Sequence, residues 1–443
     1  MSNSTLMLSD ITIKEWRSIS HAKIDFSING EPRKKTIFLG ENGAGKTSIL
    51  RAIALSTVPV IEATALIAEM SGIQRRKNKK GVTSPESCII AKFVDRSGKE
   101  EFSVTTKIVL GSDGKEMVIR ETIPIDFPWD RVFSAGYGVG RGVRGAAEIS
   151  EYDRRTSVLS LFKDNAPLFD AESVLKAIAL ESKFNETTKR PQFPSLNYFK
   201  KIIRNLFCLS PAHRIDVAGK GVYIHGPWGS QPFHALGDGY RSAAGWVLDF
   251  LARAWSLDGN TRKEPSGIVL VDEVDEHLHP SWARKIISIL IRNFPEVQFI
   301  FTTHSPVPIV NSMPNELVVI SQHNTITEIH QNLPSTSAKT IDTILRGRWF
   351  GLTGTMDDVT ENLVSDYRNA IENGDNQGIE KARTALYKSA PTLSPTGLEE
   401  VAMKAVNIIK QDEEVVHIGK DVVAFNNALT QKIKNKTNEI KND

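Results

Sequence analysis

Apolar and polar residues alternate along the N-terminal part of the chain. One set of apolar positions begins at Leu8 and a second at Ile19, with the two-residue period that is typical of half-buried strands. The unbroken apolar run at residues 36–39 predicts a buried strand, which leads into a glycine-rich turn and a helix from about Lys46. Further period-two segments predict an antiparallel meander at residues 88–94, 102–110 and 117–123.

The middle of the chain changes to helical spacing. Residues 153–206, which include a proline-containing stretch, predict a short helical insert. No heptad repeat continues over many turns, so the pattern excludes long coiled-coil arms. Beyond the insert, nearly all-apolar strands alternate with helices, which indicates a parallel sheet covered on both faces. The strands are expected at residues 214–224, 267–271 and 297–302, and the helices at residues 238–255 and 281–293.

The remaining residues predict helices and complete the fold class. The helices are expected at residues 340–346, 359–372, 378–389 and 398–411, followed by a Lys/Asn-rich segment at 431–443 that we expect to fray. The predicted class is α/β, with an antiparallel β subdomain, a short helical insert and a C-terminal helical region. We expect a first lobe at 1–152, the insert at 153–206, a second lobe at 207–335 and the helical region at 336–443.

Composition places the chain among ordinary globular proteins. Its 443 residues are 40% hydrophobic and 24% charged, and the net charge of +3 is too small to indicate nucleic-acid binding by itself. Cys88 and Cys208 lack neighbours at zinc-ligand spacing, so we expect two reduced thiols. The N-terminus has no secretory pattern, and no apolar run approaches the ~20 residues of a membrane-spanning helix. We therefore expect a cytoplasmic protein without a membrane partner.

The glycine-rich turn carries the clearest chemical motif. Residues 40–47 fit the pattern GxxxxGK[ST] in full, directly after a predicted strand and before a predicted helix. In such a loop, backbone N–H groups close around phosphate oxygens and the helix N-terminus favours their charge. Lys46 should reach the β- and γ-phosphates of ATP, and the Thr47 hydroxyl should bind Mg²⁺. The predicted nucleotide-binding residues of this Walker A motif are Gly40, Glu41, Asn42, Gly43, Ala44, Gly45, Lys46, Thr47 and Ser48.

A second motif ends the predicted strand at residues 267–271. This apolar run is followed by two carboxylates, Asp272 and Glu273, in the pattern of a Walker B motif. Asp272 is predicted to hold Mg²⁺ beside Thr47, and Glu273 to polarise the attacking water as the catalytic base. The two motifs support each other, which argues against two solvated carboxylates at a strand end.

From these residues onward the chain resembles a known family. Residues 272–280 (DEVDEHLHP) resemble the DEP-x-x-HLHP segment of the soluble ABC-type ATPases related to SMC, RecF and OLD proteins, and residues 301–306 (FTTHSP) resemble their switch-histidine strand. The resemblance implies that His304 contacts the γ-phosphate and that residues 275–279 form a D-loop at a dimer interface. His277 and His279 alone would suggest a metal pair, but zinc sites usually need three or four ligands.

Residues 236–242 (LGDGYRS) lie where the family has its LSGGQ-like signature. The resemblance implies that Gly237, Asp238 and Gly239 bind the γ-phosphate of a partner protomer, in a head-to-tail homodimer or higher homo-oligomer. Gly237 replaces the family's serine and Tyr240 its glutamine or glutamate, so the hydroxyl contact is absent. An ordinary helix cap is the alternative interpretation.

Three further segments have two interpretations each. A glycine-rich run at 136–141 follows an apparent strand at 131–134 and ends at Arg141. Arg141 is expected either to contact phosphate or the interface, or to lie in a flexible turn. Trp16 packs in the core in preference to stacking on adenine. The basic cluster at residues 75–80 binds double-stranded DNA through its phosphates, or is a solvated loop tip.

The family resemblance suggests a function in defence against phages. The short insert, the signature and the absence of a recognisable TOPRIM-type nuclease pattern resemble the ATPase subunit of Septu-type systems, with retron-associated and PARIS-type ATPases as close competitors. The implied function is a slow ATPase that senses or gates, while a separate HNH nuclease or toxin acts as the effector. The alternatives are a RecF-like DNA-repair ATPase and an ATP-dependent scaffold with little hydrolysis.

Overall fold

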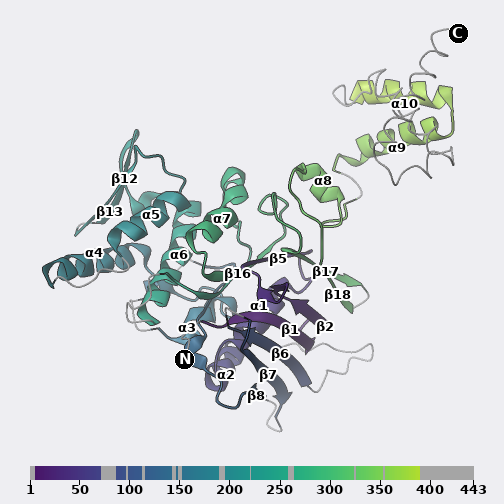
Figure 1. Cartoon of the computed structure of the whole chain (residues 1–443). Coiled ribbons are helices and arrows are strands. Elements are labelled where there is room, and N and C mark those ends of the chain that lie inside the picture. Colours follow the sequence, from purple (N-terminus) through teal and green to yellow (C-terminus); the bar gives the residue numbers. More distant parts are fainter. Residues whose placement is uncertain are drawn as a thin grey trace. The chain divides into compact units, whose positions relative to one another are not determined.

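A computed structural model describes most of the chain (Figure 1). The described residues are 5–70, 86–95, 98–111, 115–141, 146–147, 152–188, 195–219, 221–257, 264–323, 326–352 and 355–389. The contacts divide the chain into two units, Met1–Gly351 and Leu352–Asp443. The basic cluster at 75–80, the predicted helix at 398–411 and the segment at 431–443 lie outside the described residues.

The first unit is built on a six-stranded central sheet. Its order is β18-β17-β5-β16-β15-β9, and all neighbouring strands are parallel except the edge pair β17 and β18. The predicted parallel sheet is thus confirmed, whereas the edge hairpin of β17 and β18 was not predicted. The strands are β5 (Lys35–Leu39), β9 (Ser134–Tyr137), β15 (Gly267–Val271), β16 (Val297–Thr303), β17 (Leu317–His323) and β18 (Ile326–His330).

Helices and a second sheet cover the two faces of the central sheet. Because side chains alternate along a strand, Val269 and Val271 of β15 pack in a core with α6 (Asp238–Leu257) and α7 (Pro280–Asn293). Ile268 and Leu270 pack in the opposite core, with α1 (Lys46–Ser56) and the second sheet. Burial on both faces explains why these strands are continuous apolar runs in the sequence.

The second sheet is the predicted antiparallel meander. Its order is β2-β1-β6-β7-β8, with antiparallel pairing throughout. Trp16 lies at the end of β1, is fully buried and donates its indole N–H to the carbonyl oxygen of Ser48 at 2.9 Å, so the packing interpretation of Trp16 is confirmed. The strands are β1 (Met7–Trp16), β2 (Ile19–Asp25), β6 (Glu86–Val94), β7 (Glu101–Leu110) and β8 (Glu116–Ile123).

The rest of the first unit adds helices and corrects two predicted strands. The helical insert contains α3 (Arg154–Val158), α4 (Ala171–Thr188) and α5 (Leu196–Leu206). One strand was predicted at 214–224, but the chain turns there and forms the hairpin of β12 (Arg214–Ala218) and β13 (Gly221–Gly226). The strand predicted at 131–134 is wrong as well, because Trp129–Arg131 forms a 3-10 turn and β9 begins only at Ser134.

The second unit contains a pair of helices. These are α9 (Asp358–Glu372) and α10 (Asn376–Ser389), as predicted, and they share a small core around Tyr367 and Leu386. The short helix α8 (Ile341–Arg346) was predicted too and belongs to the first unit. Within the described ranges, none of the helices has the length and apolar character required to cross a membrane.

A buried charge network ties the central sheet to α6. The Asp249 carboxylate accepts hydrogen bonds from the Tyr137 hydroxyl at 2.8 Å, the Arg253 Nε at 2.7 Å and the Phe169 N–H at 2.8 Å. Asp249 is fully buried and Arg253 is 2% exposed. Removing one partner of such a pair leaves an uncompensated buried charge, so Asp249→Ala should lower the free energy of unfolding by about 3–5 kcal/mol.

Urea unfolding of the purified variant measures this loss. The matched control is Glu121→Ala, which breaks a surface pair with Lys107 and should change the free energy of unfolding far less, because solvent screens the pair. Equal effects of the two substitutions would contradict a structural role for the buried network.

Candidate functional site

The glycine-rich turn lies between β5 and α1, at the carboxyl edge of the central sheet. Gly45 is the N-cap residue of α1 with φ 107°, in a region that residues with side chains rarely adopt. A Cβ atom at Gly40 would lie 2.3 Å from the carbonyl oxygen of Ile320 in β17, so no larger residue fits there. The first N–H groups of α1 have no partner within the helix and can bind the oxygen atoms of a phosphate.

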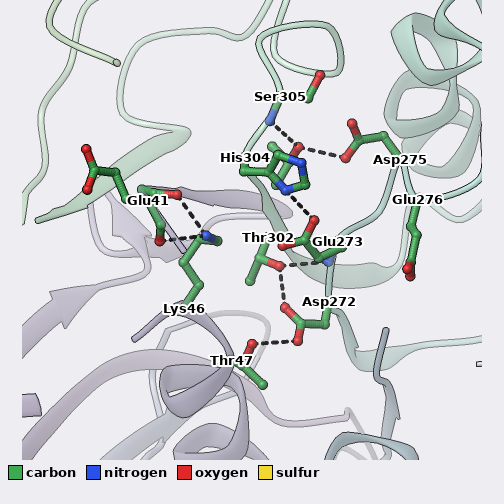
Figure 2. Close-up of polar contacts among 12 residues, drawn as sticks. Glu41, Lys46, Thr47, Asp272, Glu273, Asp275, Glu276, Thr302, His304 and Ser305 are labelled. Atoms are coloured by element: carbon green, nitrogen blue, oxygen red, sulfur yellow. Dashed lines mark hydrogen bonds and ion pairs between the residues drawn. The ribbon is translucent and has the colours of Figure 1, made fainter. Parts of the chain in front are cut away.

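Lys46 folds back over this turn. Its ammonium group donates to the carbonyl oxygen atoms of Gly40 at 2.7 Å and Glu41 at 3.1 Å (Figure 2). Burial lowers the pKa of Lys46, while the charges of Glu273 and Asp272 act in the opposite direction. Of the other predicted residues in the loop, Ala44 and Ser48 are buried, whereas Glu41, Asn42 and Gly43 are exposed.

Asp272 follows β15 and faces the start of α1. Its carboxylate accepts hydrogen bonds from the Thr47 hydroxyl at 2.7 Å and from the Thr302 hydroxyl at 2.5 Å (Figure 2). Asp272 is 1% exposed, so both oxygen atoms are fixed in direction. A threonine hydroxyl and a carboxylate at this distance are hard oxygen ligands of the kind that Mg²⁺ prefers. The donor set therefore fits Mg²⁺ at the predicted position.

Glu273 and His304 form a close pair beside Asp272. The Nδ1 atom of His304 lies 2.5 Å from Oε2 of Glu273, and the N–H of Glu273 donates to the Thr302 hydroxyl at 2.8 Å (Figure 2). The Glu273 side chain is 17% exposed and that of His304 is 57% exposed. The pair thus lies at the edge of the site that solvent and a substrate can reach. Thr302 was not singled out in the sequence, although it precedes the TH pair of the switch strand.

The predicted D-loop is fixed by hydrogen bonds to the same strand. The Thr303 hydroxyl donates to Asp275 at 2.7 Å and accepts the N–H of Ser305 at 3.0 Å. His279 is the N-cap residue of α7, where its Nδ1 atom accepts the N–H of Ser281. A capping role accounts for His279 without a metal, and the described residues contain no group of three or more potential metal ligands.

The predicted signature segment contacts the predicted D-loop of the same chain. A Cβ atom at Gly239 would lie 2.6 Å from the carbonyl oxygen of His277, so glycine permits this close approach. The ring of Tyr240 packs on those of Phe207 and Trp282, with centroids 4.9 and 4.7 Å apart. Tyr240 thus anchors the start of α6. Gly237 and Asp238 are exposed, and Asp238 forms an ion pair with Arg241.

The site residues come from segments far apart in the sequence. Thr47, Asp272, Glu273 and His304 meet at the carboxyl ends of neighbouring parallel strands, where α/β proteins commonly bind ligands. Arg141 approaches from the end of β9 and contacts the backbone of the Walker B segment.

The chain is similar to known protein families and to solved structures. The family model described as "AAA domain, putative AbiEii toxin, Type IV TA system" matches residues 35–309, and the model described as "AAA ATPase domain" matches residues 7–57. The SMC head domain from Thermotoga maritima is 17% identical with a TM-score of 0.42, over 73% of this chain and 98% of that one.

Two curated relatives are similar over most of the chain. A Septu protein PtuA of Bacillus mycoides is 29% identical over 79% of this chain and 46% of that protein. A retron Ec83 probable ATPase of Escherichia coli is 23% identical over 68% of this chain and 69% of that protein. The predicted resemblance to Septu ATPases is confirmed, although the match spans less than half the length of the Bacillus mycoides relative. The family model described as "AAA domain, putative AbiEii toxin, Type IV TA system" matches more than half of this chain, at residues 35–309. The chain therefore belongs to that family.

Proposed function

We propose that the chain binds ATP with Mg²⁺, hydrolyses it slowly and uses the cycle to gate a separate effector in defence against phages. The contacts that join Thr47, Asp272, Glu273 and His304 carry this proposal, because they bring the hydroxyl and the carboxylate that are proposed to bind Mg²⁺ beside a carboxylate–imidazole pair. In P-loop ATPases the bound metal ion neutralises charge on the phosphates. The similarity to Septu and retron ATPases supports the defence role.

Each residue has a defined task in the proposed reaction. Lys46 exchanges its two carbonyl contacts for the β- and γ-phosphate oxygens of ATP. The Glu273 carboxylate accepts a proton from the attacking water. His304 lies within hydrogen-bonding distance of that carboxylate and orients the γ-phosphate beside it. Asp272 and Thr47 hold Mg²⁺, and Thr302 keeps the Asp272 carboxylate in place.

Assembly and partners extend the proposal beyond one chain. We propose a head-to-tail homodimer in which Gly237, Asp238 and Gly239 of one protomer face the ATP of the other, since Gly237 and Asp238 are exposed at the start of α6. The effector is proposed to be an HNH nuclease or a toxin. The proposed lobes at 1–152 and 207–335 share the central sheet, to which each contributes strands.

The purified chain should hydrolyse ATP slowly and cut neither DNA nor RNA. The described residues include the proposed nucleotide-binding residues, but no group of three or more His, Cys, Asp or Glu side chains that could hold a metal ion, as two-metal nucleases need. Phosphate release and plasmid nicking, measured on the same preparation with Mg²⁺, test this expectation. Metal-dependent nicking that is abolished by a point mutation in this chain would refute the proposal that a separate effector cuts the nucleic acid. Undetectable phosphate release would favour the alternative of an ATP-dependent scaffold.

A further inference from the structure

Arg141 lies four residues after the end of β9, and its guanidinium group reaches the Walker B segment. Its Nη2 atom donates to the carbonyl oxygen of Glu273 at 2.6 Å, and Nη1 donates to the carbonyl oxygen atoms of Asp272 and, at 3.0 Å, of Gly138. The side chain is 2% exposed. Arg141 therefore binds the backbone of the two carboxylate residues and not their side chains.

The backbone at Glu273 needs such support. Glu273 has φ 49°, the left-handed conformation that is unfavourable for residues other than glycine and persists only where the surroundings impose it. Its N–H donates to Thr302 and its carbonyl oxygen accepts from Arg141, so hydrogen bonds hold the residue on both sides. The preceding residue is fixed too, because the N–H of Asp272 donates to the carbonyl oxygen of Tyr137 at 2.8 Å.

The chemistry of this position favours arginine. A planar guanidinium group presents several donors in a rigid fork, whereas a lysine ammonium group cannot hold neighbouring carbonyl groups with the same geometry. Burial lowers the pKa of Arg141, and the nearby carboxylates of Glu276, Asp272 and Asp275 oppose that effect. Arg141 is thus a buried positive charge close to these carboxylates.

We propose that Arg141 is a positioning residue, which fixes the left-handed backbone of Glu273 and so directs the Glu273 carboxylate toward His304 and the attacking water. This inference rests on the proposed ATPase function. The Asp272 carboxylate is also held by the hydroxyl groups of Thr47 and Thr302, whereas the left-handed backbone of Glu273 relies on Arg141. Arg141 is therefore expected to affect the hydrolysis step much more than the binding of ATP.

The test begins with Arg141→Met, which keeps the apolar stem and removes the fork. A misplacement of about 1 Å in a catalytic group can reduce the rate about 100-fold, so kcat should fall by about that factor while the Kd for ATP stays within about threefold. Arg141→Lys keeps the charge but lacks the planar fork, so its kcat should fall as well, by less than that of Arg141→Met. A wild-type kcat for both variants, or a Kd for ATP that weakens as much as kcat falls, would overturn the proposal.

Arg33→Met is a matched control. Arg33 is 7% exposed and its guanidinium group also donates to the carbonyl oxygen of a residue with positive φ, Asn315. Among the described residues, the Nε atoms of Arg33 and Arg141 both lack a hydrogen-bond partner. Arg33→Met should therefore reproduce any general loss of stability and leave kcat per folded molecule unchanged. A loss of kcat as large as that of Arg141→Met would assign a merely structural role to Arg141.

A double-mutant cycle with Glu273→Gln separates this inference from the proposed function. Once the base is absent, its position no longer matters, so adding Arg141→Met should slow single-turnover hydrolysis by less than about threefold. Losses that multiply in the double variant would overturn the positioning role of Arg141. If Glu273→Gln alone hydrolyses ATP at the wild-type rate, the assignment of Glu273 fails instead, whatever Arg141→Met does.

Discussion

Glu273→Gln should keep ATP binding, lose at least ~100-fold in turnover and accumulate the ATP-bound dimer, because general-base steps typically contribute ~10²–10⁴-fold. The amide is nearly isosteric with the carboxylate and can remain beside His304, so the site should still assemble. It cannot accept the proton of the attacking water. Nucleotide affinity, steady-state phosphate release and the ATP-dependent change in mass measure the three effects.

Glu69→Gln is the matched control for this substitution. Glu69 is similarly half-buried, with 21% of its side chain exposed, and it too is ion-paired, with Arg155 and Lys163. It lies in α2 (Val60–Glu69), outside the proposed catalytic residues, so turnover should stay near the wild-type value. If both variants hydrolyse ATP like the wild type, Glu273 is not the catalytic base.

Lys46→Ala should behave differently and weaken ATP binding itself. The ammonium group is buried and adjoins the phosphate-binding turn, and losing one partner of a buried charged hydrogen bond typically reduces affinity by 2–5 kcal/mol. We therefore expect the Kd for ATP to rise by at least about 30-fold. Titration with a fluorescent ATP analogue measures the affinity.

Lys35→Ala provides the comparison for Lys46→Ala. Lys35 lies at the start of β5 with 16% of its side chain exposed, and it pairs with Glu316. Lys35→Ala removes a half-buried lysine from the same sheet without touching the phosphate-binding turn, so the Kd for ATP should not change. Unchanged ATP affinity in Lys46→Ala would contradict the proposed contact between Lys46 and the phosphates.

The parts of the site that are local in sequence could be predicted from it. The glycine-rich turn, Lys46 and Thr47 occupy consecutive positions, and the strand before them and the helix after them have clear periodic patterns. The pairing of Walker A with Walker B followed from the motifs, although the hydrogen bond between Thr47 and Asp272 joins residues that are 225 positions apart.

The role of Arg141 could not be predicted, because its acceptors are backbone carbonyl groups. The carbonyl groups of Asp272 and Glu273 lie 131 and 132 positions away, and every residue type has a backbone carbonyl group, so the residue type does not show which one is an acceptor. From the glycine-rich run at 136–141 we expected Arg141 to contact phosphate or an interface, or to lie in a flexible turn. The positive φ of Glu273 was not predicted either, because a glutamate at this position gives no sign of a left-handed backbone.

Turn residues explain the wrong strand at 214–224. The segment Ala218–Gly221 contains two glycine residues, and Gly221 has φ 155°, which marks the turn between β12 and β13. The apolar spacing on either side of the turn was mistaken for one continuous strand. The hairpin of β17 and β18 is an edge of the central sheet, where mixed polar residues weaken the apolar pattern.

Single-turnover hydrolysis of radiolabelled ATP tests most directly whether this chain hydrolyses ATP with Glu273 as base. Wild type and Glu273→Gln would be mixed with a small amount of Mg²⁺-ATP, enzyme in excess, and the conversion of bound ATP to ADP followed over time. We predict equal amounts of bound nucleotide, with ADP forming in the wild type and at least ~100-fold more slowly in the variant. Conversion at the same rate in both proteins would contradict the assignment of Glu273 and, with it, the proposed catalytic site.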